Sequence, residues 1–141
     1  MRNPFRKSTP ITRQLVLQDQ QSAAIKEMFG IDFNLELIVR GFALSMTNDK
    51  LPSRWRCYSL GNGGIYLAMD GNQSYRVRYD NGGQGELTSE ALSIACGLLA
   101  YNRLSFCLDL ALAENFDRCY FLLREYAMEH AEANSIMEAL R

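Results

Sequence analysis

Four cysteines and one histidine carry the most distinctive chemistry in this chain, and their spacing bears on two kinds of site. The cysteines are Cys57, Cys96, Cys107 and Cys119, and no two of them form a C-x-x-C pair. Structural zinc is usually held by four Cys or His ligands in two close pairs, so we expect no metal site. A cysteine nucleophile needs a histidine base within reach. The single histidine, His130, falls near the expected end of a helix, where a capping or surface role is favoured.

Glycine-rich turns are a second candidate for a functional site, because such loops can bind phosphate. A P-loop requires G-x-x-x-x-G-K-[ST] between a strand and a helix, and no lysine follows any of these glycines. Gly61, Gly63 and Gly64 join two expected strands, so no helix N-terminus faces that turn. Residues 82–85 do precede an expected helix and could bind an anion there, but plain turn geometry is the favoured interpretation.

Arginines and tyrosines in the middle of the chain could form a basic, aromatic surface of the kind that binds single-stranded nucleic acid. These residues are Arg54, Arg56, Arg76 and Arg78, with Tyr58 and Tyr66 near them. The two pairs of arginines fall on different expected strands, which need not be neighbours. A solvated outer face of an antiparallel sheet is therefore the favoured interpretation.

Acidic residues outnumber basic ones from Glu86 to Glu138. Such a face could dock a basic partner, and a solvated rim on two amphipathic helices is the simpler alternative. Glu125 and Glu129 lie four residues apart and would share one side of a helix. The carboxylates have no spacing that indicates a general acid and base pair. We therefore expect no catalytic residue, no cofactor and no enzyme activity.

Helices are expected on both sides of the segment that carries these residues. Helical spacing and caps predict them at about residues 19–29, from an Asp32 or Asn34 cap to about Met46, from Thr88 or Ser89 onwards with a break near 102–103, from near Asn115, and at about 132–140. The segment after Thr88 is apolar nearly all round, which is typical of a helix at the buried centre of a fold.

The middle of the chain has the two-residue period of strands. Short aromatic-rich runs at residues 55–60, 65–69 and 75–79 are separated by Gly/Asn turns, and a short fourth strand is expected near 86–87. Strands this close must be hairpins, since a parallel crossover needs a dozen residues or more. The sequence thus predicts an α+β fold, with a small antiparallel three- to four-stranded meander packed with N-terminal and C-terminal helices.

Composition limits the classes of function. The chain has 141 residues, 48% of them hydrophobic, and a formal net charge of -1. That charge is too low for an ordinary DNA binder and too neutral for a protein that imitates DNA. No membrane span is expected, and free thiols favour a cytoplasmic location. Residues 1–16 are expected to form a basic flexible arm, and residues 17–141 a single domain.

The aromatic runs and the central turn also carry a resemblance. The segment from Trp55 to Leu67 reads WRCYSLGNGGIYL and resembles the W-x-x-Y-x-L-x-N-G-G-x-Y core of the KlcA/ArdB antirestriction proteins. Residues 85–91, GELTSEA, are similar to the family's entry into its central helix. Residues 120–130 resemble its C-terminal signature, with Ala131 where proline is expected. The likeness extends from about Met28 to Leu140.

The resemblance implies a protein of plasmids or other mobile genetic elements that protects incoming DNA from type I restriction endonucleases. We expect it to bind a protein, either the restriction enzyme or a host factor that controls it, without stable duplex DNA binding and without DNA mimicry. The alternative is a small nucleic-acid-binding module that uses the basic arm and the sheet arginines. The expected partner contacts are Trp55, Tyr58, Asn62, Gly63, Gly64, Tyr66, Glu125 and Glu129.

Overall fold

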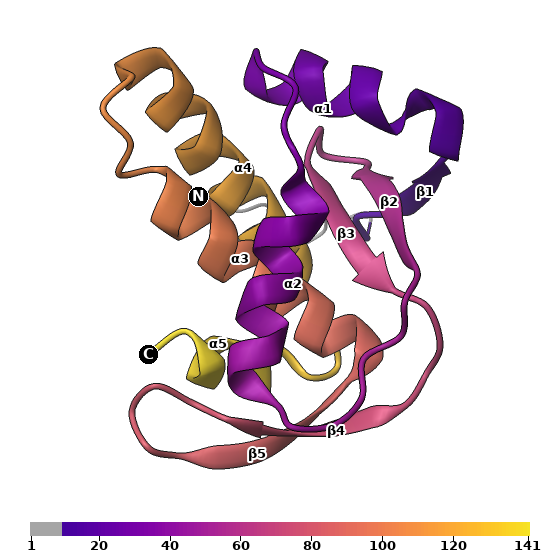
Figure 1. The fold of residues 1–141 in the computed structure, drawn as a ribbon, viewed down its shortest axis with the longest axis vertical. Helices are drawn as coiled ribbons and strands as arrows, with labels where there is room; N and C mark the ends of the chain where they lie inside the picture. Colours follow the sequence, from indigo (N-terminus) through magenta and orange to yellow (C-terminus); the bar gives the residue numbers. More distant parts are fainter. Residues whose placement is uncertain (1–9) are drawn as a thin grey trace, which may run out of the picture.

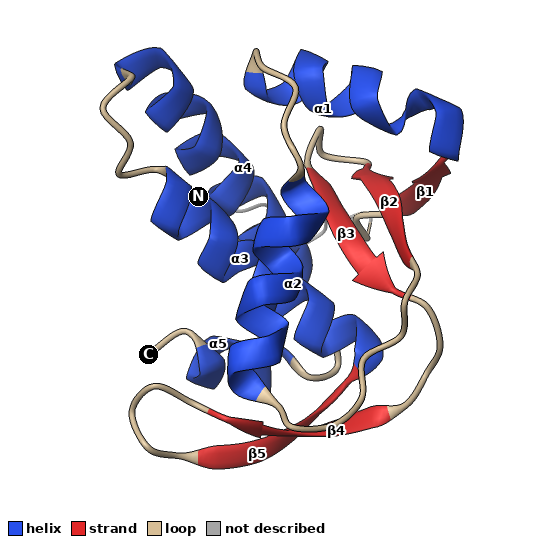
Figure 2. Ribbon diagram, in the orientation of Figure 1, coloured by secondary structure: helices blue, strands red, loops and turns tan. Residues whose placement is uncertain are grey.

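Residues 10–141 are described by a computed structural model (Figure 1). Within this range the chain forms five strands, five α-helices and one 3-10 helix (Figure 2). In chain order they are β1 (Arg13–Val16), η1 (Gln18–Gln20), α1 (Gln21–Phe29), α2 (Leu35–Met46), β2 (Trp55–Leu60), β3 (Ile65–Met69), β4 (Ser74–Arg78), β5 (Gln84–Thr88), α3 (Ser89–Leu104), α4 (Leu110–Met128) and α5 (Ala133–Ala139). The predicted α+β class is confirmed.

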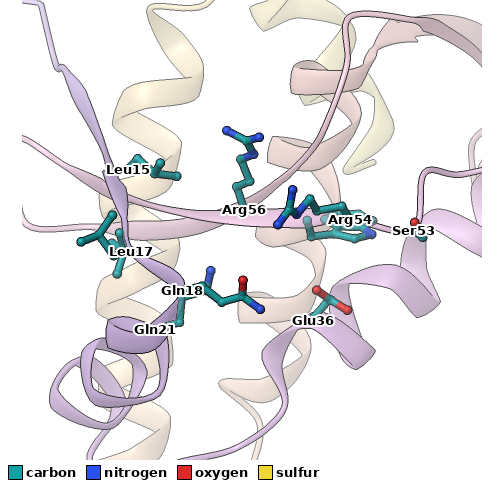
Figure 3. A pocket seen from close by; sticks show the side chains of 10 residues that line it. Leu15, Leu17, Gln18, Gln21, Glu36, Ser53, Arg54 and Arg56 are labelled. Atoms are coloured by element: carbon teal, nitrogen blue, oxygen red, sulfur yellow. The ribbon is translucent and has the colours of Figure 1, made fainter.

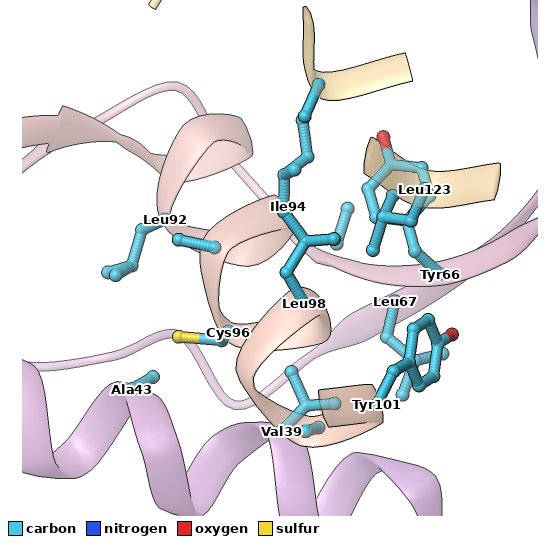
Figure 4. Close-up of a cluster of buried hydrophobic side chains, with 14 of the residues drawn as sticks. Val39, Ala43, Tyr66, Leu67, Leu92, Ile94, Cys96, Leu98, Tyr101 and Leu123 are labelled. Carbon is cyan, nitrogen blue, oxygen red and sulfur yellow. The ribbon is translucent and has the colours of Figure 1, made fainter. Parts of the chain in front are cut away.

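Helix α3 is the centre of the molecule, as its all-round apolar character predicts. It packs against α2, α4, α5 and β3, and Leu92, Ile94 and Leu98 are fully buried. Figure 4 shows them in one buried cluster with Val39 and Ala43 of α2, Tyr66 and Leu67 of β3, and Leu123 of α4.

Helix starts follow the expected capping chemistry. The Asn34 side chain accepts a hydrogen bond from the Leu37 N–H at 3.1 Å, and Thr88 accepts one from Ala91 at 3.4 Å. Helix α4 begins at Leu110, five residues before the predicted start at Asn115. The Asp109 side chain caps it by accepting from the Leu112 N–H at 3.1 Å. That cap is hidden in the sequence, because the apolar residues around it look like a continuation of α3.

The strands divide into two antiparallel sheets, β1-β2-β3 and β4-β5, instead of one continuous meander. Strands β2 and β3 have the predicted bounds, and β5 runs directly into α3. Figure 1 shows the β4-β5 hairpin at the foot of the molecule, away from the three-stranded sheet. Arg54 and Arg56 therefore lie beside a different sheet from Arg76 and Arg78, and the basic face considered from the sequence is not assembled.

The predicted arm over residues 1–16 is wrong for its last four residues, which form β1. This strand pairs with β2 in the register Arg13↔Leu60 to Val16↔Cys57. The pairing is between segments more than 40 residues apart, and β1 is largely exposed, so it has no alternating apolar pattern to reveal it. Residues 10–12 precede β1 and belong to no helix or strand, and residues 1–9 lie outside the described residues.

The outer edge of β3 is closed by side chains of α3. The Met69 N–H donates to Ser93 Oγ at 2.9 Å, and the Tyr101 hydroxyl donates to the Ile65 carbonyl oxygen at 2.6 Å. Ser93 and Tyr101 are both fully buried. Because an unpaired strand edge offers backbone groups to other chains, these two bonds leave β1 as the open edge of this sheet, as far as residues 10–141 show.

Candidate functional site

Three segments that resemble the antirestriction motifs meet at the carboxylate of Glu90, in the first turn of α3. The Tyr66 hydroxyl from β3 donates to Glu90 Oε1 at 3.3 Å, and the Tyr126 hydroxyl from α4 donates to the same atom at 3.0 Å. Arg13 Nη1 from β1 donates to the Tyr66 oxygen at 2.9 Å and lies 3.8 Å from Glu90 Oε1. The carboxylate also lies near the positive end of the α3 dipole, which favours its negative charge.

Aromatic rings stack behind this carboxylate. The ring centroids of Tyr58 and Tyr66 are 5.9 Å apart, and those of Tyr66 and Tyr126 are 5.7 Å apart. The Arg13 guanidinium carbon lies 4.0 Å from the Tyr58 centroid, so the cation covers the outer face of the stack. We refer to Arg13, Tyr58, Tyr66, Glu90 and Tyr126 as the Glu90 cluster.

His130 lies at the border of the Glu90 cluster and is bonded locally. Its Nδ1 accepts a hydrogen bond from the Glu132 N–H at 3.0 Å, which places the proton of the neutral ring on Nε2. Nε2 is 4.0 Å from Glu90 Oε2. Glu132 in turn accepts hydrogen bonds from the N–H and the hydroxyl of Thr88, the residue that caps α3. The His130 side chain thus bonds the backbone of the turn between α4 and α5, just after the helix end at which the sequence placed it.

The chemistry of the Glu90 cluster is that of hydrogen-bond positioning. Burial raises the pKa of the Tyr66 phenol far above its usual range, and the Glu90 charge adds to the effect. Burial likewise raises the pKa of Tyr126. Both phenols therefore remain protonated donors at neutral pH. The cluster ties β1, β3, α3 and α4 together while the Glu90 side chain stays 33% exposed.

The Asn62-Gly63-Gly64 turn is accounted for by its own geometry. Asn62 Nδ2 donates to the Leu122 carbonyl oxygen of α4 at 2.8 Å, and Asn62 Oδ1 accepts from the Gly64 N–H at 3.0 Å. Gly63 has φ +96°, a value that favours glycine, and a Cβ on Gly64 would lie 3.1 Å from the Leu122 Cβ. The turn therefore docks the β2-β3 hairpin against α4.

The remaining residues that the sequence predicts as partner contacts differ in their exposure to solvent. Trp55 is 5% exposed and Tyr66 is fully buried, so neither side chain offers a contact surface as folded. Tyr58 is half-buried beside Arg13. Glu125 and Glu129 are exposed at the end of α4, and Glu129 Oε1 accepts from the Ile11 N–H at 2.8 Å, just before β1.

Sequence reasoning placed Glu90, Tyr126 and His130 in motifs but did not bring them together, and it missed Arg13. Glu90 stands in the first turn of α3, where the helix dipole favours its charge, and no local pattern in the sequence indicates its two tyrosine partners. The signal that could have linked these residues is that each motif contributes one hydrogen-bonding side chain. Arg13 gave no such signal, because β1 was not expected.

Residues 10–141 also bear on metal binding and membrane insertion. No group of three or more His, Cys, Asp or Glu side chains there could hold a metal ion. In the same range no helix has the length and apolar character needed to cross a bilayer. The four cysteines are unpaired, and Cys57, Cys96 and Cys119 are buried.

Comparison with known proteins places this arrangement in a family. The sequence profile of the antirestriction proteins matches residues 51–141. One antirestriction protein KlcA from Escherichia coli is 39% identical over 90 residues, which are 61% of this chain and 60% of that protein. Another KlcA from Escherichia coli is 29% identical over 137 residues, which are 93% of this chain and 95% of that protein.

The fold is also shared with a solved structure from work on KlcA and ArdB. The two superpose with a TM-score of 0.83 at 27% identity, covering 96% of this chain and 99% of the other. KlcA and ArdB are described as having a novel fold and antirestriction activity against type I DNA restriction systems in vivo but not in vitro. The match over most of its length shows that this chain belongs to the antirestriction protein family.

Proposed function

We propose that this chain relieves restriction of incoming DNA by type I restriction endonucleases, and that it does so by binding a protein. KlcA and ArdB act against type I systems in vivo but not in vitro. An inhibitor that works only in cells needs a component that a purified assay lacks. This favours a host factor that controls the restriction enzyme over the enzyme itself. The chain would act in the cytoplasm of a cell that receives plasmid or other mobile DNA.

The proposed mechanism rests on the hydrogen bonds that acidic side chains accept within the protein. A DNA mimic needs carboxylates at near-regular spacing along an extended surface, to match about one charge per 1.7 Å of duplex. Here Glu90 accepts from two tyrosines, Glu132 accepts from Thr88, and Asp109 caps α4. Carboxylates held by such internal partners do not line up as a phosphate backbone, which supports binding without mimicry.

The ion pairs of the basic side chains likewise speak against binding of duplex DNA. Arg56 Nε lies 2.7 Å from Asp70 Oδ1, and Arg40 Nη2 lies 3.3 Å from Glu36 Oε2. Arg13 is held in the Glu90 cluster. A charge already paired within the protein releases fewer counterions on binding DNA, so it contributes less affinity.

The contact surface that we propose combines the exposed end of α4 with the accessible part of the Glu90 cluster. Glu125 and Glu129 supply charge there, and Arg13 and Tyr58 form the adjoining edge. Buried Tyr66 would hold this surface in place without touching the partner.

The test is the plating of unmodified phage on a type I restricting host, with and without this gene. We expect wild type to raise plating efficiency by orders of magnitude. Glu125→Gln with Glu129→Gln should reduce that relief about tenfold, corresponding to about 1.4 kcal/mol of lost binding. Glutamine at 129 keeps an acceptor for the Ile11 N–H, so the fold is preserved.

The matched control replaces two exposed acids on other parts of the chain, Glu86→Gln with Glu114→Gln. It should relieve restriction as wild type does. No relief by soluble wild-type protein would contradict the proposed function. Submicromolar, salt-sensitive binding of purified protein to duplex DNA would instead support a nucleic-acid-binding module.

A further inference from the structure

Strand β2 extends past the end of β1, and this leaves a gap in the three-stranded sheet. The last β1-β2 pair is Val16↔Cys57, whereas β2 begins at Trp55. After Val16 the chain turns into η1 and no longer follows β2. Backbone groups of successive strand residues face alternate sides. The Asp70 N–H bonds the Arg54 carbonyl oxygen on the β3 side, so the N–H and C=O of Trp55 face the side that β1 has left.

A groove of about 420 Å³ occupies this gap. Figure 3 shows its lining side chains converging from three directions: β1 and η1, the start of β2, and helix α2. Leu15 and Leu17 are 42% and 57% exposed at one wall. Gln18, Gln21 and Ser53 add uncharged polar groups. One wall of the groove is thus apolar, and its floor is the open backbone of β2.

Trp55 also lines this groove and has an unused hydrogen-bond donor. Its indole Nε1 is buried and has no partner within residues 10–141. That unpaired donor costs free energy, and no hydrogen bond from a described residue holds the Trp55 ring in place. The outward-facing N–H and C=O of Trp55 supply one donor and one acceptor for a bound strand.

We propose that this groove binds an extended peptide segment of a partner protein, which adds to β2 at Trp55 as a short strand and carries a carboxylate opposite Arg54. Backbone hydrogen bonds would hold the segment, as in other cases of strand addition, while the flanking side chains select its sequence. Leu15 and Leu17 would receive an apolar side chain of the segment. The proposal rests on the proposed function for the identity of the partner.

The charged side chains that line the groove favour an acidic segment as the occupant. Arg56 is paired with Asp70, and Glu36 is paired with Arg40, so these charges are compensated. Arg54 is exposed and forms no ion pair with any described residue. The groove therefore has one uncompensated positive charge, which favours a carboxylate on the bound segment.

Two segments of the chain that could add to β2 as a strand do not match this chemistry. In a second copy, the open edge of the corresponding sheet is β1, whose residues 13–16 include an arginine and no acid. Residues 1–9 contain two arginines, one lysine and no acid. Neither supplies a carboxylate to face Arg54, which favours a different protein as the occupant.

The test uses Trp55 itself, because it is the single tryptophan of the chain. The probe is a blocked peptide of alternating valine and glutamate, titrated into full-length protein while Trp55 emission and hydrogen exchange of the Trp55 amide are followed. We expect a saturable change in emission and slower exchange. The same peptide with N-methylated backbone amides, or with lysine for glutamate, should bind at least about fivefold more weakly.

Two charge-reversal variants complete the test. Arg54→Glu should weaken binding of the valine–glutamate peptide about fivefold, whereas Arg76→Glu, an exposed arginine of the other sheet, should bind as wild type does. No saturable binding, equal binding of the lysine peptide, or equal binding by Arg54→Glu would overturn the proposal. So would a change in Trp55 emission with protein concentration alone, since that would make a second copy the occupant.

Plating assays separate this proposal from the proposed function. If the peptide binds and wild type gives no relief of restriction, the proposed function is contradicted and peptide binding in the groove is supported. If wild type relieves restriction and the peptide does not bind, peptide binding in the groove is contradicted and the proposed function is supported. If both hold, Arg54→Glu should lose relief and Arg76→Glu should keep it.

Discussion

The hydroxyl of Tyr126, two residues before the end of α4, donates a 3.0 Å hydrogen bond to Glu90 in the first turn of α3. The same carboxylate oxygen accepts from Tyr66 at 3.3 Å, so one atom joins a strand and two helices. Because Arg13 bonds the Tyr66 oxygen, the bond network extends to β1 as well. Removing one member should therefore affect the others.

We expect Tyr126→Phe to lower the free energy of unfolding by about 1 kcal/mol, the contribution of one hydrogen bond, because the ring still packs against Tyr66. Glu90→Ala should lower it further, since two phenols then lose their acceptor and Arg13 loses its ionic partner. Urea unfolding followed by circular dichroism measures both. Glu125→Ala, an exposed acid of α4, is the matched control and should change stability little. Equal stability of Glu90→Ala and Glu125→Ala would contradict this role of the cluster.

Two helical glycines should respond oppositely to alanine. Gly41 lies on the exposed side of α2 with nothing within 4 Å of an added Cβ, so Gly41→Ala should stabilise by about 0.5–1 kcal/mol. An added Cβ on Gly97 of α3 would lie 2.9 Å from Leu123 Cδ2, and Leu123 is fully buried. Gly97→Ala should destabilise by about 1 kcal/mol, as overpacking does. The melting temperatures of the two variants, compared with wild type, test both expectations. A shift of the same sign in both variants would contradict the packing argument.

The four thiols should react at very different rates in the folded protein. Burial raises the pKa of Cys57 to about 12 and that of Cys119 to about 11, and it raises the pKa of Cys96 further. The thiolate is the reactive form, so we expect rapid labelling of partly exposed Cys107 alone at pH 8.

Denaturation should release all four thiols, provided that the protein is alkylated at lysis and purified without reductant. The Cys107→Ser variant should show no fast phase in the folded state. A total of two or none after denaturation would indicate disulfides. Two or more fast thiols in the native protein would mean that the core opens more readily than its packing indicates.

Stability should fall at alkaline pH. For Cys57 the pKa is raised from 9.0 to about 12 on folding, so the folded state binds its proton more tightly than the unfolded state. Its contribution is complete below pH 9 and is lost as the pH rises towards 12, by about 1.4 kcal/mol for each pH unit. Urea midpoints measured from pH 7 to 11 should decrease above pH 9. Cys57→Ala should flatten that decrease, and an unchanged slope would contradict the linkage.

Local sequence signals were sufficient for β2 and β3, because Gly/Asn turns bracket them, and for α3, because apolar residues occur on all its sides. They were not sufficient for β1, whose partner strand is more than 40 residues away and whose side chains are mostly exposed. The Glu90 cluster depends on the same tertiary pairing. Burial of Trp55 and Tyr66 could not be predicted either, since an aromatic residue in a motif suits a core and a contact surface equally well.

The closure of the β3 edge by Ser93 and Tyr101 has a consequence for aggregation. Fibril growth by edge-to-edge pairing needs a template edge on both sides of every added molecule. The three-stranded sheet offers such an edge only on its β1 side, as far as residues 10–141 show, so an accidental pairing there would end after two molecules. Ser93→Ala combined with Tyr101→Phe would leave two backbone groups of that edge without partners, and pairing of β3 with another chain would then also require α3 to move away. Helix α3 and its two buried hydroxyl groups thus act together as a terminator of polymerisation.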